Sequence, residues 1–292
     1  MFKPLLLPPI AAALLLTACA SVPEAEGPAR KETLLAVTQD HQLIRFNAGQ
    51  PQRILDRKPL LGLPPGDNLV GIDFRVARGV LYGLSQQGQL FTIDASSGRM
   101  TRVGSQPLAV ALPQGSIGFD FNPAADRIRV VGGSFNLRLH PDTGQVVDGD
   151  PATPGVQPDT PLAYARGDVH EGRQPDIVGA AYTYNKTDDK LTTNYAIDRS
   201  LGTLVMQGSR EGVQPVVSPN GGQLRTVGKL GLGPLADAAF DIADVSNAAF
   251  AAVRTASGGR TRLYEVDLAS GQARLIGTVG DGGPIRGLAI EP

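Results

Sequence analysis

The stretch LFTIDASSGRMTRV at residues 90–103 contains the motif that decides the fold. Residues 90–94 read as an alternating strand that ends in Asp94, Ser97 and Gly98 follow as a turn, and residues 100–103 begin a second strand. Alternation with a period of two predicts a half-buried β-strand, and Asp and Gly tolerate the backbone angles of a tight turn. The stretch therefore predicts a β-hairpin.

The same hairpin pattern occurs at four other places in the chain, which indicates a repeat fold. These copies begin at Leu43, Asn136, Asn194 and Leu263, and each contains a turn with a glycine. A small-residue strand precedes four of the hairpins, at residues 71–74, 118–121, 179–182 and 239–242, and a further short apolar strand follows it in the clearer copies. Four strands per repeat is the content of a propeller blade.

The two ends of the repeat region complement each other. Residues 285–290 form a first strand with nothing after it, whereas residues 34–55 supply three strands that lack a first one. Joining them completes one blade, so we predict an all-β fold, a five-bladed β-propeller closed by pairing of the C-terminal strand with the N-terminal blade. Insertions are expected around residues 148–176 and 209–234. A six-bladed ring with a blade hidden around residues 224–228, and a β-sandwich, are the alternatives.

The N-terminus predicts a targeting segment. Lys3 precedes an apolar run at residues 5–16, which ends in Leu16-Thr17-Ala18-Cys19. The run is shorter than the roughly 20 residues that a membrane-spanning helix needs. We predict a signal peptide at residues 1–18, a lipidated cysteine with a flexible, polar tether at 19–32, and the propeller at 33–292; an ordinary signal peptide is the alternative.

This segment resembles the lipobox of bacterial lipoproteins. The resemblance implies a diacylglyceryl group and a third acyl chain, such as palmitate, on Cys19, which would make the membrane a partner through the lipid anchor. By the sorting habit of that class, Ala20 and Ser21 imply the periplasmic face of the outer membrane. Cys19 is the only cysteine of the chain, so the mature protein is expected to contain no disulfide.

The repeat region also resembles a family. The strings GIDFRVARGVLYGL, LFTIDASSGRMTRVG, GFDFNPAADRIRVVG, NLRLHPDTG and LYEVDLASG resemble the bacterial family catalogued as domain of unknown function 4394, over residues 34–290. The family implies a propeller-like extracytoplasmic domain. It implies no activity and no catalytic residues.

Charge and composition limit the partners. Lys and Arg number 27 against 28 Asp and Glu, without a basic run, so we expect no nucleic-acid binding. The three histidines show no metal-binding spacing, so we expect no cofactor of the zinc or copper kind. The chain is expected to form a monomeric domain.

Carboxylates on the first strands are the main candidate site. Asp73, Asp120 and Asp241 occupy the same position in three of these strands, where the other two have Ala181 and Ala289. Strand alternation places Arg75 on the face of Asp73, and Asn122 on the face of Asp120. The three carboxylates are predicted either to accept backbone N–H groups of a neighbouring blade or to bind a polar ligand or Ca²⁺ in the channel. Asp148 and Asp150 are a weaker calcium candidate, for which a simple turn is the alternative.

These features favour a non-catalytic binding or scaffold propeller at the cell envelope, with a protein or a small polar ligand as partner. No catalytic residue can be named. The alternative is a propeller hydrolase, lactonase or lyase that acts on a small polar substrate with help from channel carboxylates and calcium. The scarcity of histidine and the lack of tryptophan favour the binding protein, because general bases and stacking platforms are few.

Overall fold

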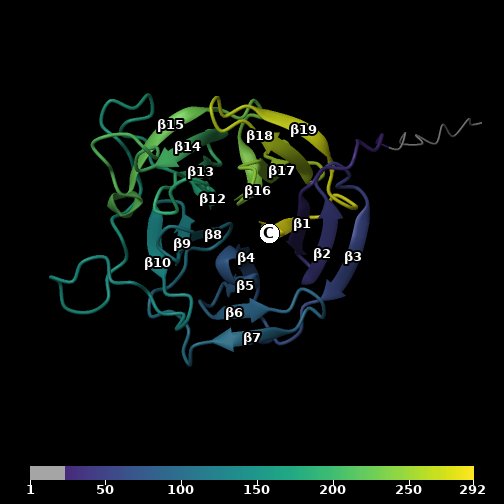
Figure 1. The fold of residues 1–292 in the computed structure, drawn as a ribbon, viewed down its shortest axis with the longest axis horizontal. Helices are drawn as coiled ribbons and strands as arrows, with labels where there is room; N and C mark the ends of the chain where they lie inside the picture. The colour runs from purple at the N-terminus through teal and green to yellow at the C-terminus, as the bar shows by residue number, and fades with distance from the viewer. Residues whose placement is uncertain (1–23) are drawn as a thin grey trace, which may run out of the picture.

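Five β-sheets follow one another around a central axis in the computed structural model, which describes residues 24–292 (Figure 1). The predicted five-bladed β-propeller is therefore confirmed, and the six-bladed ring and the β-sandwich are wrong. Helix is confined in these residues to two short 3-10 segments, η1 (Val76–Arg78) and η2 (Pro219–Gly221). No helix within residues 24–292 has the length and apolar composition needed to cross a membrane.

The first blade combines the two ends of the chain. From the axis outward it contains β20 (Ile285–Ile290), β1 (Thr33–Thr38), β2 (Gln42–Asn47) and β3 (Ile54–Pro59). Leu34 of β1 pairs with Ile290 of β20 in an antiparallel register. The predicted closure is confirmed, and it removes the open sheet edges that the first and last strands would otherwise expose.

The other four blades are continuous in sequence. The second blade contains β4 (Leu69–Arg75), β5 (Val80–Ser85), β6 (Leu90–Ile93) and β7 (Met100–Val103), and the third contains β8 (Gly118–Asn122), β9 (Arg127–Gly132) and β10 (Phe135–Leu139). The fourth contains β12 (Ile177–Tyr182), β13 (Asn194–Asp198), β14 (Thr203–Gln207), β15 (Gln223–Lys229) and the short parallel β11 (Ala163–Tyr164). The fifth contains β16 (Leu235–Ile242), β17 (Ala249–Thr255), β18 (Arg262–Val266) and β19 (Ala273–Thr278).

Two strand assignments from the sequence need correction. The hairpin that begins at Asn194 is the second and third strand of its blade rather than the third and fourth, and β15, which the sequence placed in an insertion, is the fourth. Residues 145–147 do not form a fourth strand in the third blade, where only a bridge between Leu139 and Val146 remains. Both differences lie beside the insertions, where the repeat spacing of the sequence is interrupted.

The blades pack face to face through apolar side chains, with small residues where the inner strands come closest. A side chain on Gly118 of β8 would place its Cβ 2.6 Å from the backbone nitrogen of Ala180 in β12. Likewise, a Cβ on Gly287 of β20 would lie 2.9 Å from the nitrogen of Ile72 in β4. The inner strands therefore approach one another closely enough for a side chain of one blade to reach the backbone of the next.

Residues 24–32 have partners on the propeller, although the sequence predicts a tether that pairs with nothing. Nη1 and Nη2 of Arg30 donate to the Glu265 carboxylate of β18, at 2.9 and 3.0 Å, and the guanidinium lies over the Phe250 ring. Glu24 accepts the backbone N–H of Thr278 at 2.8 Å. This stretch, here called the strap, joins the fifth blade to the start of the first. Polar residues without hydrophobic periodicity gave no signal of such ion-pair docking. Cys19 and the predicted signal peptide lie outside the described residues.

Candidate functional site

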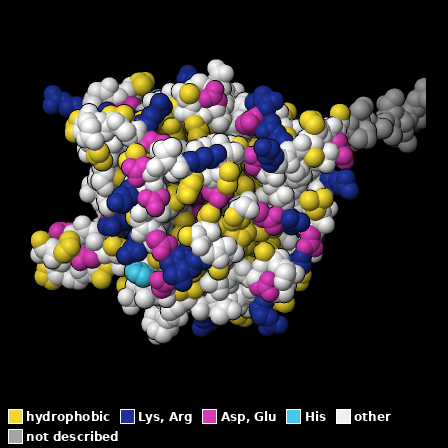
Figure 2. Space-filling view, viewed as in Figure 1, with side chains coloured by type: hydrophobic (Ala, Val, Ile, Leu, Met, Phe, Trp, Pro, Cys, Tyr) yellow, Lys and Arg dark blue, Asp and Glu magenta, His cyan; other side chains and the backbone are white. Residues whose placement is uncertain are grey.

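A cavity of about 470 Å³ lies where the inner strands of the five blades end. Figure 2 shows the molecule along the ring axis, with acidic and hydrophobic side chains gathered around the centre of the face in view. The cavity, here called the axial pocket, is lined by charged residues and by aromatic ones. They include Asp73, Arg75, Arg78, Asp120, Asp126, Asp189, Asp241 and Asp244, with Phe74, Phe121, Tyr182 and Tyr184.

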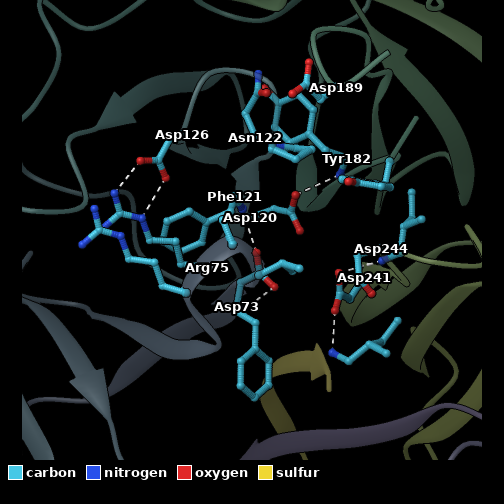
Figure 3. Close-up of a pocket in the computed structure, with 18 residues that line it drawn as sticks. Asp73, Arg75, Asp120, Phe121, Asn122, Asp126, Tyr182, Asp189, Asp241 and Asp244 are labelled. Carbon is cyan, nitrogen blue, oxygen red and sulfur yellow. Dashed lines mark hydrogen bonds and ion pairs between the residues drawn. The ribbon is translucent and has the colours of Figure 1, made fainter. Parts of the chain in front are cut away.

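The three aspartates predicted from the repeat converge in this pocket, as Figure 3 shows. Asp73, Asp120 and Asp241 come from β4, β8 and β16, and each is at least 93% buried, with exposures of 7%, 4% and 4%. One carboxylate oxygen of each lies within 4.8 Å of the others. The equivalent position in each repeat therefore becomes one cluster at the axis, here called the aspartate cluster.

Each carboxylate of the cluster also bonds to the inner strand of the next blade. Asp73 accepts the N–H of Phe121 at 2.7 Å, Asp120 accepts that of Tyr182 at 2.9 Å, and Asp241 accepts that of Ile290 at 2.6 Å. Every donor is the residue that follows the equivalent position in the neighbouring repeat. The carboxylates thus satisfy backbone groups that the close approach of the strands would leave buried.

The two alanines at the equivalent position explain a second set of bonds. Ala181 and Ala289 cannot accept an N–H from the next blade, so the N–H groups of Ile242 and Phe74 need other acceptors. Asp241 Oδ1 accepts the first at 2.6 Å, and Asp73 Oδ1 accepts the second at 2.7 Å. Asp73 and Asp241 consequently use both oxygens. Asp120 accepts no second N–H from the described residues, and only its Oδ1 accepts one, that of Tyr182.

The electrostatics of the cluster are unfavourable without a positive charge. Among residues 24–292, no Lys, Arg or His forms an ion pair with the three carboxylates. Burial and then repulsion by Asp241 raise the pKa of Asp73 well above its ordinary value, and burial and repulsion by Asp73 do the same to the pKa of Asp120. Burial raises the pKa of Asp241 to about 7. The cluster therefore favours either a proton or a cation.

Arg75 does not supply that cation. It lies on the predicted face of Asp73, and it is 3% exposed, but its guanidinium binds Asp126, and its Nη1 donates to Asp142 at 2.6 Å. Asn122 lines the pocket, and its Oδ1 accepts the N–H groups of Ala124 and Ala125. Arg75 at the end of β4 and Asn122 at the end of β8 thus line the rim of the axial pocket, and neither forms an ion pair or a described hydrogen bond with the aspartate cluster.

Sequence reasoning missed the aromatic wall and the outer carboxylates. Tyr182 directly follows Ala181, as Phe121 directly follows Asp120, so alignment of the repeats carried a signal for both rings. Tyr184, Asp189 and Asp244 lie in turns after the inner strands, where the repeat pattern stops. These positions could be found only from the structure.

Asp148 and Asp150, the weaker calcium candidate, lie apart from the pocket. Asp148 Oδ1 accepts the N–H groups of Asp150 and Gln157. Asp150 Oδ1 accepts the N–H of Ala152, and its Oδ2 accepts the hydroxyl of Thr153. Such bonds from a short acidic side chain to the backbone two residues onward are typical of turns.

The fold and the cavity define a five-bladed β-propeller with an acidic axial pocket. The chain belongs to the family described as domain of unknown function (DUF4394), which matches residues 42–289. No curated protein sequence matches the chain.

Solved structures that resemble the chain share little sequence with it. One, a chain of a nidogen/laminin complex, is 13% identical with a TM-score of 0.48, over 89% of this chain and 98% of that one. A glutaminyl cyclase from Myxococcus xanthus is 13% identical with a TM-score of 0.44, over 80% of this chain and 82% of that one. YCF48 from Cyanidioschyzon merolae is 12% identical with a TM-score of 0.39, over 85% of this chain and 71% of that one. Likenesses of this degree transfer no function.

Proposed function

We propose that this protein is a non-catalytic binding propeller whose axial pocket holds a small ligand through a positively charged group. The observation that carries the proposal is the aspartate cluster, three buried carboxylates within 4.8 Å that face a cavity of about 470 Å³ and have no ion-pair partner among the described residues. Like charges at this spacing repel one another strongly in a medium of low polarity. A ligand cation would relieve that repulsion.

The walls of the pocket favour an organic cation, such as an ammonium group. Six aspartates and two arginines line the cavity, and one of the arginines, Arg75, already pairs with Asp126 and Asp142. Phe121, Tyr182 and Tyr184 add aromatic surface near the carboxylates. Aromatic faces attract a desolvated cation, with about 2 kcal/mol in favourable cases, and they also pack against the alkyl part of an amine.

Calcium is the second candidate, because three oxygens within 4.8 Å of one another fit a single ion with oxygen ligands at about 2.3 to 2.6 Å. An ion there would leave coordination positions open toward the cavity for a substrate. A calcium-assisted hydrolase, lactonase or lyase, with an aspartate as general base, is the activity that this arrangement would support.

The test measures thermal unfolding and calorimetric binding of the full-length protein with n-butylamine, with n-butanol as the uncharged counterpart, and with calcium chloride. We expect butylamine to raise the Tm and butanol to leave it unchanged. Asp120→Asn should abolish the butylamine effect, and Asp281→Asn, an exposed carboxylate outside the pocket, should preserve it. A response to calcium alone would replace the proposal with the calcium site, and a folded protein that responds to neither would overturn both.

We further propose that the propeller is carried on a lipid at Cys19 and faces the periplasm from the outer membrane. The lipobox-like Leu16-Thr17-Ala18-Cys19 and the following Ala20 and Ser21 support this location. Cys19→Ser should move the protein from the membrane fraction to the soluble fraction without changing its Tm. Wild-type protein that is soluble in the absence of detergent would contradict the lipid anchor.

A further inference from the structure

A second cavity, of about 330 Å³, adjoins the axial pocket between the third and fourth blades. Asn122 and Tyr182 line both cavities, so the two cavities share a wall at these side chains. This second cavity is here called the side pocket. Its other lining residues lie in the β8–β9 turn, in the β12–β13 loop at residues 183–193, at Asn194 of β13 and Gln207 of β14, and in the β14–β15 connection at residues 208–222. A ligand that fills the axial pocket thus has room to extend outward from the ring axis.

The two pockets carry opposite charge. Six of the axial lining residues are aspartates, whereas the side pocket is lined by Lys190 and Arg210 with one acid, Glu211. The β12–β13 loop divides them, because Asp189 lines the axial pocket and the next residue, Lys190, lines the side pocket. The charge of the lining residues therefore changes from mainly negative in the axial pocket to mainly positive in the side pocket.

The basic residues of the side pocket have no internal counter-ion. No ion pair within residues 24–292 includes Lys190 or Arg210. The Glu211 carboxylate is held by Thr183 and Asn185, whose Oγ1 and Nδ2 donate to it at 3.1 and 3.2 Å. Lys190 and Arg210 thus lack a carboxylate partner among the described residues, and the Arg210 guanidinium also lies within reach of the Tyr195 hydroxyl.

One buried side-chain amide oxygen, on a residue that lines the side pocket, has no hydrogen-bond donor among the described residues. Gln207 Nε2 donates to the Pro219 carbonyl at 2.7 Å, which turns Gln207 Oε1 toward Asn194 Nδ2 at 3.1 Å. This relay fixes the Asn194 amide, which is 2% exposed, and its Oδ1 accepts no hydrogen bond from the described residues. A buried acceptor without a donor costs free energy, about 1 to 3 kcal/mol.

We infer that the ligand is dipolar: an ammonium group binds the aspartate cluster, and a carboxylate several bonds away binds Lys190 and Arg210 in the side pocket. The inference rests on the proposed function, since it places the cationic end in the axial pocket, and it adds the anionic end and the direction in which the ligand lies. The chemical class is that of amino acids with separated charges and of short peptides. Their ends differ in charge as the two pockets do.

The experiment compares, by calorimetry, ω-amino acids from 4-aminobutyrate to 8-aminooctanoate with n-alkylamines of the same chain length. Amino acids too short to reach the basic residues should bind no better than the amines. At the length that spans the pockets, the amino acid should bind about 10-fold more tightly than its amine, the gain expected for a charge-assisted contact. The double variant Lys190→Gln/Arg210→Gln should lose this gain and bind the amines unchanged. Lys186→Gln, on the same loop but outside both linings, is the matched control.

The outcomes separate this inference from the proposed function. Amines that bind while no amino acid binds more tightly would overturn the dipolar ligand and leave the axial site standing. A gain that survives in the double variant would also overturn it, because the extra affinity would arise elsewhere. If neither amines nor amino acids bind, the proposed function fails, and the inference fails with it.

Discussion

Asp241 accepts the backbone N–H of Ile290 at 2.6 Å, so a buried carboxylate of the fifth blade bonds to the last strand of the chain across the closing junction of the ring. The same carboxylate belongs to the aspartate cluster of the candidate site. The proposed ligand site and the ring closure therefore share Asp241. A substitution in the cluster removes a buried negative charge and can also break a hydrogen bond to the backbone. Because the three aspartates accept different numbers of hydrogen bonds, an experiment can separate these two effects.

Asparagine should have opposite effects on stability at Asp73 and at Asp120. Both Asp73 oxygens accept a backbone N–H. In Asp73→Asn the side-chain NH₂ would face one of these N–H groups and leave it without an acceptor, so the free energy of unfolding should fall by about 1 to 3 kcal/mol. Asp120 uses one oxygen, so Asp120→Asn can keep the Tyr182 bond while it removes a buried charge. The second variant should be more stable than the wild type at pH 8. Urea denaturation measures both, and equal losses would contradict the assignment of bonds.

Stability should decrease as pH rises. Burial raises the Asp241 pKa from an ordinary 3.8 to about 7, and the pKa values of Asp73 and Asp120 are raised as well. Between about pH 4 and about pH 7 the folded state therefore holds more protons than the unfolded state, so the cost of ionising Asp241 grows through this window and levels off above it. The free energy of unfolding of the ligand-free protein, followed from pH 4 to pH 8, should show this decline. Asp241→Asn should make the decline shallower, because only Asp73 and Asp120 then keep a raised pKa, and an identical profile in that variant would count against Asp241 as a source.

Removal of the Arg30 side chain should destabilise the closing junction. Arg30→Ala loses a two-bond ion pair with Glu265, whose side chains are only 24% and 31% exposed, together with the contact over Phe250. The expected loss is about 1 kcal/mol, the upper range for a partly exposed pair. Arg45→Ala breaks the more exposed pair with Glu291 and should cost less. Thermal melts of both variants test the order, and equal Tm values would mean that the strap does not hold the junction.

A methyl group between the third and fourth blades should be costly. The Cβ of Gly118→Ala would lie 2.6 Å from the Ala180 nitrogen and 2.8 Å from the Gly179 carbonyl carbon, and backbone atoms cannot move aside as a flexible side chain can. We expect a loss of about 1 to 3 kcal/mol in the free energy of unfolding. Gly221→Ala, where no atom lies within 4 Å of the added Cβ, serves as the control and should be neutral. Equal Tm values for the two variants would mean that β8 and β12 leave room for a methyl group at residue 118.

The blade count was predictable from the sequence because each blade repeats the same local pattern. The hairpin at residues 90–103 forms β6 and β7 as expected, and the two incomplete ends predicted the pairing of β1 with β20. The fourth blade was misread at Asn194, because its second strand follows a loop of polar residues and its fourth strand lies beyond an insertion. Local alternation identifies a strand, but only the hydrogen-bonded neighbours determine its place in a sheet.

The candidate site was predictable as far as the repeat extends. Asp73, Asp120 and Asp241 occupy the same position in three repeats, so the sequence alone identified the three residues that converge at the axis. Lys190 and Arg210 carried no such signal, since they lie in a loop and an insertion that occur once in the chain. A single charged residue in a loop gives no indication of what it faces, and the strap residue Arg30 was missed for the same reason.

Pairing of Leu34 with Ile290 also sets the order of events during folding. These residues lie near opposite ends of the described chain, so the contact has almost the largest sequence separation that the protein allows, and such contacts form slowly. While the chain is being synthesised from its N-terminus, one edge of β1 stays unpaired until β20 has been made. The other four blades can form in sequence during that time. The strand that is synthesised last, β20, therefore completes the ring, and a chain interrupted just short of it would expose the unpaired edge of β1 to other chains.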